Sequence, residues 1–174
     1  MTGEFHTTFN TEGLPAIMNI TIVPFGNARK QGSKYSCQHG TDECYGNRWE
    51  QCAISHYPDP ADHVPFYYCM EKAGDNMLKQ VQKCATQAGL EYATLQKCYG
   101  TDAKPSAESS ALQAKAAADT PSSHQYVPWI MINGKKSKSD GDKLLQEVCS
   151  AYTGTKPAAC KKLEQKQQKK RCYA

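Results

Sequence analysis

Nine cysteines in a chain of 174 residues constrain the fold more than any other feature of the sequence. No two of them are separated by two residues, which is the spacing of a zinc knuckle or of a dithiol redox pair. Cysteines spread through one domain favour a disulfide framework formed in an oxidising compartment. No metal site is predicted. Eight of the cysteines are candidates for disulfides, namely Cys37, Cys44, Cys52, Cys69, Cys84, Cys98, Cys149 and Cys160.

Length and composition suit one globular domain with a core of its own. Hydrophobic residues make up 39% of the chain, and no apolar run approaches the roughly eighteen residues of a spanning helix, so we expect no membrane insertion. The net charge of +4 comes largely from the tail after residue 160. That tail could bind a polyanion, but a solvated, frayed extension is the favoured interpretation. We expect no nucleic-acid partner and no cofactor.

Local patterns predict an α/β chain. Alternating β-branched residues predict a strand over Met18–Phe25, and a second strand over Tyr126–Asn133 ends at the hairpin dipeptide Asn133-Gly134. Residues 26–68 are expected to be irregular, with one short helix near Arg48–Ser55. Further helices are predicted over 69–88, with Gly89 as its stop, and over 90–98, 107–118 and 143–152.

Two observations on secretion disagree. Asn19-Ile20-Thr21 is a sequon for N-glycosylation, and a disulfide-rich chain has to enter the secretory route. Residues 1–15 nevertheless contain Glu4 and Glu12 and no apolar segment of a signal peptide. We expect either that a signal peptide has been removed or that Met1 is not the natural start.

Residues 37–52 carry the most specific motif, CQHG, two residues, EC, two residues, N, four residues, C. It fixes Cys37, Gln38, His39, Gly40, Glu43, Cys44, Asn47 and Cys52. This motif resembles the signature of the gamma-interferon-inducible lysosomal thiol reductase family. Residues 19–28 and 124–129 also resemble that family, and the resemblance extends over roughly residues 16–160.

Two other interpretations of this motif arise from the residues alone. A metal site could be built from Cys37, His39, Cys44, Cys52 and His56, but their spacings and the cysteine count favour disulfides. His39 and Glu43 could form an acid–base couple, although capping or backbone hydrogen bonding in a tight loop is favoured. Cys37 and Cys44 are expected in a loop without a helix N-terminus, as a structural bridge.

The resemblance implies a thioredoxin-like domain over residues 1–160, with a cysteine-rich, partly helical insert at about 27–120 and a basic tail at 161–174. It also implies that Val127, Pro128 and Trp129 form a cis-proline loop that binds an extended substrate segment. From the residues alone, a proline that terminates an edge strand is the alternative.

The activity implied is reduction of disulfides in protein substrates, in the lysosome or outside the cell. It requires a Cys-x-x-Cys pair at a helix N-terminus, which stabilises the attacking thiolate, while the second cysteine resolves the mixed disulfide. Because no cysteine precedes Cys37, we expect the catalytic pair and the first strand upstream of Met1. The alternative is a non-catalytic, secreted binding module. Cys172 is the ninth cysteine and is not among the disulfide candidates. It could be a free thiol, form an intermolecular disulfide or pair with a cysteine upstream of Met1.

Overall fold

The computed structural model describes residues 2–32 and 34–172. The chain forms two compact units, one from Met1–Ile20 with Pro128–Ala174, the other from Thr21–Val127. The motif of residues 37–52 lies entirely in the second unit.

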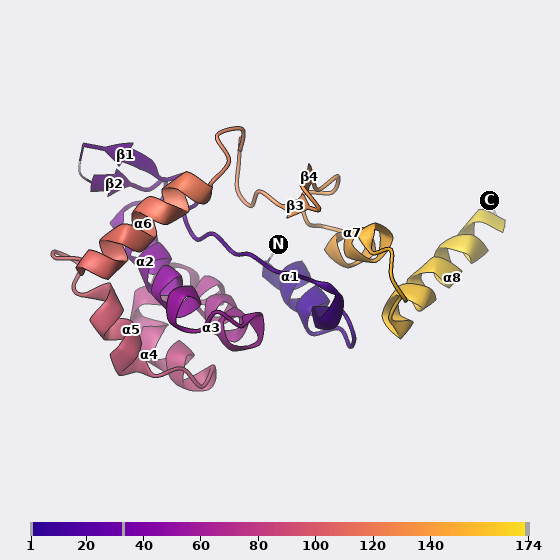
Figure 1. Cartoon of the computed structure of the whole chain (residues 1–174), viewed down its shortest axis with the longest axis horizontal. Helices are drawn as coiled ribbons and strands as arrows, with labels where there is room; N and C mark the ends of the chain where they lie inside the picture. Colours follow the sequence, from indigo (N-terminus) through magenta and orange to yellow (C-terminus); the bar gives the residue numbers. More distant parts are fainter. Residues whose placement is uncertain (1, 33, 173–174) are drawn as a thin grey trace. The chain divides into compact units, whose positions relative to one another are not determined.

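The second unit is a helical assembly around α2 (Figure 1). The helix α2 (Thr41–His56) packs against α3 (Pro60–Ala73), α4 (Met77–Gln87), α5 (Tyr92–Tyr99) and α6 (Ala107–Asp119). A 3-10 turn, η2 (Gly74–Asn76), separates α3 from α4. Ahead of these helices, β1 (Arg29–Gln31) and β2 (Lys34–Ser36) form an antiparallel hairpin with Lys30 opposite Tyr35.

The core of this unit lies between α2 and the helices around it. Phe66 and Met70 of α3 and Leu95 of α5 are fully buried there. The ring of Trp49 stacks on Tyr99, with centroids 4.1 Å apart, and on Tyr92 at 5.8 Å. Each large apolar side chain removed from water contributes about 1.5–3 kcal/mol, so this cluster is the main stabilising element of the unit.

Short local signals set the ends of these helices. Asp59 caps α3 by accepting the N–H of Ala61 at 2.8 Å, and Pro60 occupies the first helical position. Ser106 caps α6 through the N–H of Ser109 at 2.9 Å. Gly89 has a φ of 73°, and the N–H of Leu90 returns to the carbonyl of Ala85. The predicted stop at Gly89 is therefore confirmed.

The first unit contains the two ends of the chain. Its elements are α1 (Thr2–Phe9), η1 (Pro15–Ile17), β3 (Met131–Ile132), β4 (Lys135–Lys136), α7 (Leu144–Ala151) and α8 (Ala158–Cys172). Leu14, Cys149 and Cys160 form its buried core, and α1 packs against α7. Asn133 and Gly134 have φ values of 49° and 74°, so the predicted hairpin turn between β3 and β4 is confirmed.

Several sequence predictions are wrong. Met18–Phe25 is not a strand: residues 18–23 have no regular structure and a turn follows. A strand requires a neighbour that pairs with its backbone, and the only β-pairings in the described residues are the two hairpins and an isolated bridge between Gly100 and Pro105. For the same reason the strand expected over Tyr126–Asn133 is reduced to Met131–Ile132.

Residues 26–68 are more regular than predicted, because α2 is sixteen residues long and α3 begins at Pro60. The helix expected over 69–88 is two helices separated at Gly74. The tail expected to be frayed is helical, since α8 reaches Cys172 and its Lys, Gln and Glu residues are good helix formers. The described residues thus form a mixed, helix-rich structure with two small sheets. In the described part of the chain, no helix is long and apolar enough to cross a membrane.

Candidate functional site

The predicted disulfide framework is confirmed, because eight cysteines form four disulfides. Three lie in the second unit, as Cys37–Cys44, Cys52–Cys98 and Cys69–Cys84. The fourth, Cys149–Cys160, joins α7 to α8 in the first unit. The ninth cysteine is Cys172, and its side chain lies outside the described part of the structure. No thiolate nucleophile is available among the eight paired cysteines while these bonds are intact.

The disulfide Cys37–Cys44 lies at the N-terminus of α2, with a Cα–Cα distance of 5.6 Å. The expectation that both cysteines lie in a loop is wrong, since Cys44 is in the first turn of the helix. Helix N-termini stabilise thiolates through their unpaired amides, although Asp42 and Glu43 in the same turn oppose this with negative charge. The bond attaches the chain ahead of α2 to the helix itself.

Glu43 closes the loop in front of α2. Its Oε2 accepts the backbone N–H of His39 at 2.7 Å and lies 3.2 Å from Nδ1 of the same residue. The side chain of His39 is 72% exposed, so its environment is that of surface solvent. Glu43 therefore caps the loop, as the sequence analysis favoured over an acid–base couple with His39. Asn47 lies one turn further along α2 and is partly buried.

The motif also holds the segment that precedes the β1–β2 hairpin. Asn27 Nδ2 donates to Gln38 Oε1 at 2.6 Å, and Gln51 Nε2 donates to the carbonyl of Pro24 at 2.7 Å. Gly26 has a φ of 61°, and a Cβ there would be 2.6 Å from Glu43 Oε1. Only glycine fits both requirements. Tertiary contacts thus bring residues 24–27 onto the motif, in a turn rather than a strand.

The predicted substrate-binding residues are divided between the units. Val127 is 41% exposed and ends the second unit, whereas Pro128 and Trp129 begin the second segment of the first unit. Trp129 is partly buried, with Lys136 Nζ 5.3 Å from its ring centroid. These residues precede β3 and belong to no strand. Asn19, the candidate glycosylation site, is exposed in the irregular segment after η1.

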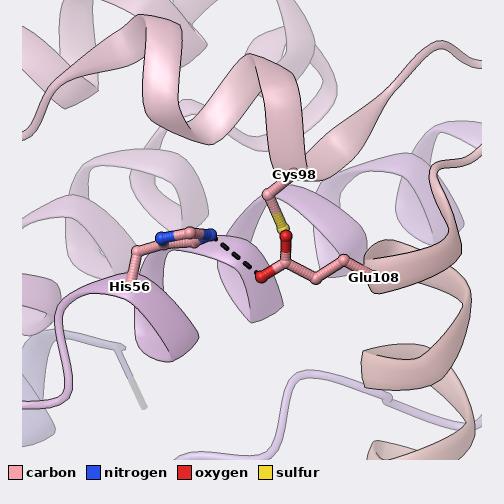
Figure 2. A group of neighbouring side chains, drawn as sticks. All are labelled: His56, Cys98 and Glu108. Atoms are coloured by element: carbon pink, nitrogen blue, oxygen red, sulfur yellow. Dashed lines mark ion pairs between the residues drawn. The ribbon is translucent and has the colours of Figure 1, made fainter.

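The structure contains a cluster of possible metal ligands that the sequence did not predict, although His56 was considered as a ligand in a different metal site. His56 Nε2 lies 2.9 Å from Glu108 Oε1, and Cys98 Sγ is within 4.8 Å of both (Figure 2). The sulfur of Cys98 is already bonded to Cys52, and a disulfide sulfur lacks the charge that makes a thiolate a metal ligand. Only an imidazole and one carboxylate remain. The ion pair joins the end of α2 to the first turn of α6.

Sequence reasoning missed a buried acidic pair. Glu50 of α2 is only 2% exposed, and its neighbour is Glu71 of α3. Burial, followed by the charge of Glu71, raises the pKa of Glu50 well above its usual range. Burial also raises the pKa of Glu71 and that of Tyr67, one turn earlier on α3. The signal in the sequence is the helical spacing of Glu50 from the apolar positions Gly46 and Ala53.

Comparisons with known proteins agree with this motif. The family model for gamma interferon inducible lysosomal thiol reductase (GILT) matches residues 1–88. The chain is 37% identical over 158 residues to the gamma-interferon-inducible lysosomal thiol reductase of Carassius auratus, which covers 84% of this chain and 61% of that protein. It is 33% identical over 164 residues to the protein of the same name in Mus musculus, covering 90% and 64%.

A plant relative fits the same pattern. The gamma-interferon-responsive lysosomal thiol protein of Arabidopsis thaliana is 33% identical over 153 residues, covering 84% of this chain and 63% of that protein. The chain belongs to the GILT family. It spans less than two thirds of the length of these relatives.

Proposed function

We propose that this chain serves as a thiol-disulfide oxidoreductase that reduces disulfides in protein substrates, in the lysosome or along the secretory route. The single observation that carries the proposal is the family match over residues 1–88, which contains the whole cysteine motif. The relatives' names describe a thiol reductase and a lysosomal thiol protein. The four disulfides suit an oxidising compartment.

The proposal places the reducing thiols outside the span Cys37–Cys160. Reduction needs a thiolate that attacks the substrate disulfide and a second thiol that resolves the mixed disulfide. The eight cysteines of that span are paired with one another, and three of the four bonds join one helix to another. We therefore assign residues 37–160 the supporting and substrate-binding parts, with Val127, Pro128 and Trp129 as the binding segment on a thioredoxin-like scaffold.

The second candidate is a binding module that uses the same scaffold without redox chemistry. It is favoured by one observation, namely that each cysteine from Cys37 to Cys160 is already oxidised. Such a module would hold an extended segment of a partner by backbone pairing and would leave its disulfides unchanged.

An insulin-reduction assay separates the two candidates. The 174-residue chain and the protein isolated from its natural source are assayed in parallel, and mass spectrometry defines the sequence and the alkylated cysteines of each. We expect turnover by the natural protein, with a rapidly alkylated thiol outside Cys37–Cys160, and no turnover by the 174-residue chain. A natural protein that binds insulin without reducing it would support the binding module. Turnover by the 174-residue chain would place the chemistry among its own cysteines and contradict the assignment.

A further inference from the structure

The contact between α2 and α3 contains two carboxyl groups that approach each other inside the second unit. Glu50 is 2% exposed and Glu71 is partly buried. The two side chains lie close enough that each affects the pKa of the other. Two ionised carboxylates have no donor between them, so a hydrogen bond that joins them requires a proton on one of the two. Glu50 is buried, and its Oε1 accepts from no donor in the described residues, so this carboxyl group is the place where the folded protein holds a proton.

The proton belongs on Glu50, which is the more deeply buried partner. Its Oε1 accepts no hydrogen bond from any donor in the described residues. An ionised carboxylate in that position would lose its hydration without replacement. Protonated Glu50 can instead donate to Glu71, which reaches solvent in part and tolerates the negative charge better.

In the part of the chain that the structure describes, the surroundings of this pair supply negative charge and no buried cation that faces it. Glu43 on α2 adds negative charge, which raises the pKa of Glu71, whereas Tyr67 on α3 is a neutral phenol whose own pKa is raised by burial and by both carboxyl groups. Arg48, the buried cation of α2, is turned toward α5 and α6, where it donates to Tyr99 and Thr101. His63 of α3 is buried, with Nδ1 2.8 Å from the carbonyl of Tyr57. The charged residues of the other elements packed on α2 are exposed: Lys34, Lys79, Lys83, Lys97, Glu108, Lys115 and Asp119.

We propose that Glu50 and Glu71 form a proton-sharing lock between α2 and α3, which makes the second unit more stable in acid than at neutral pH. A carboxyl group that binds its proton more tightly in the folded state than in the unfolded chain makes the folded state more stable as the pH falls. As the pH rises above the range in which glutamate ionises in the unfolded chain, this contribution is lost, by up to about tenfold in the unfolding equilibrium constant per pH unit for one proton. The inference does not depend on the proposed reductase activity.

The test is urea unfolding of the disulfide-bonded protein between about pH 4.5 and pH 7.5, compared with Glu50→Gln. The glutamine amide donates to Glu71 at every pH and needs no proton. We expect Glu50→Gln to match the wild type in acid. Near neutral pH its unfolding equilibrium constant should be lower by about tenfold or more, so its pH dependence is flatter by about one proton.

Glu91→Gln is the matched control, because Glu91 is an exposed glutamate of the same unit. Its stability curve should run parallel to that of the wild type. Infrared spectroscopy of the wild type adds a readout that does not need the variant to fold. A protonated-carboxyl stretching band should persist near neutral pH and disappear in Glu50→Gln. Parallel stability curves for the wild type and Glu50→Gln, or no protonated carboxyl near neutral pH, would overturn the proposal.

Discussion

The guanidinium of Arg48 lies over the ring of Tyr99, with its central carbon 4.1 Å from the ring centroid. The same group donates to the carbonyls of Tyr99 at 2.7 Å and Thr101 at 3.0 Å, and to Ser109 Oγ at 3.0 Å. Arg48 is 3% exposed, and burial lowers its pKa. One side chain inside the cysteine motif thus joins α2 to the end of α5 and to α6.

Arg48→Met should destabilise the second unit by about 3 kcal/mol or more, because two carbonyls and one hydroxyl would lose their buried donor. Arg48→Lys should recover only part of this, since an ammonium cannot reproduce the planar fork of donors. Urea unfolding of the disulfide-bonded protein measures both. Lys115→Met, at an exposed position of α6, should change stability by about 0.5 kcal/mol or less. Equal effects at Arg48 and Lys115 would contradict this account.

The disulfides should differ in what they contribute, because they close loops of different length. Cys52–Cys98 closes 46 residues and Cys37–Cys44 closes 7. Chain-entropy reasoning gives about 4 kcal/mol for the longer loop and about 2.3 kcal/mol for the shorter one. Paired Cys→Ala variants, each compared by urea unfolding, test the order. A larger loss at Cys37–Cys44 would show that native contacts outweigh loop closure here.

Gly46 of α2 lies against Met77 of α4, so closely that an added Cβ would overlap the methionine sulfur. Gly46→Ala should therefore destabilise the protein by about 1–3 kcal/mol through overpacking. In a Met77→Ala background the same change should be neutral or stabilising by up to about 1 kcal/mol, because alanine favours the helix. The double-mutant cycle is measured by urea unfolding. Additive effects would mean that the two residues do not compete for this space.

Asn19 and Thr21 are exposed, and their segment has no regular structure, so the sequon is accessible to a glycosyltransferase. Expression through a eukaryotic secretory pathway should give one N-linked glycan, seen as a shift in mass that an endoglycosidase for N-glycans removes. Asn19→Gln should abolish the shift. As a control, Asn47→Gln should leave it unchanged, because Asn47 is not in a sequon. An unmodified secreted protein would contradict the prediction.

The helices with strong local signals were predictable from the sequence. The alanine-rich run over 107–118 gives α6 within one residue of its predicted end, and Asn133-Gly134 gives the hairpin turn. Each of these depends on residues a few positions apart. The strand over Met18–Phe25 failed because its alternating pattern carries no information on whether a pairing partner exists.

The candidate site likewise has features that could be predicted from the sequence and features that could not. The motif of residues 37–52 and the eight disulfide cysteines were recognisable from residue types and spacing alone. The contact of Gln51 with the Pro24 carbonyl, the burial of Glu50 beside Glu71 and the closeness of His56 to Glu108 were not. Each joins residues more than twenty positions apart, and such contacts depend on how the helices pack.

Sequence alone determined the family, the use of cysteine in disulfides and the local ends of several helices, because these depend on residue types within a short span. Tertiary structure alone decided which cysteines pair, how far α2 extends and where charge is removed from water. The physical reason is that burial and pairing are properties of groups brought together from distant parts of the chain, and each depends on the packing of the whole unit.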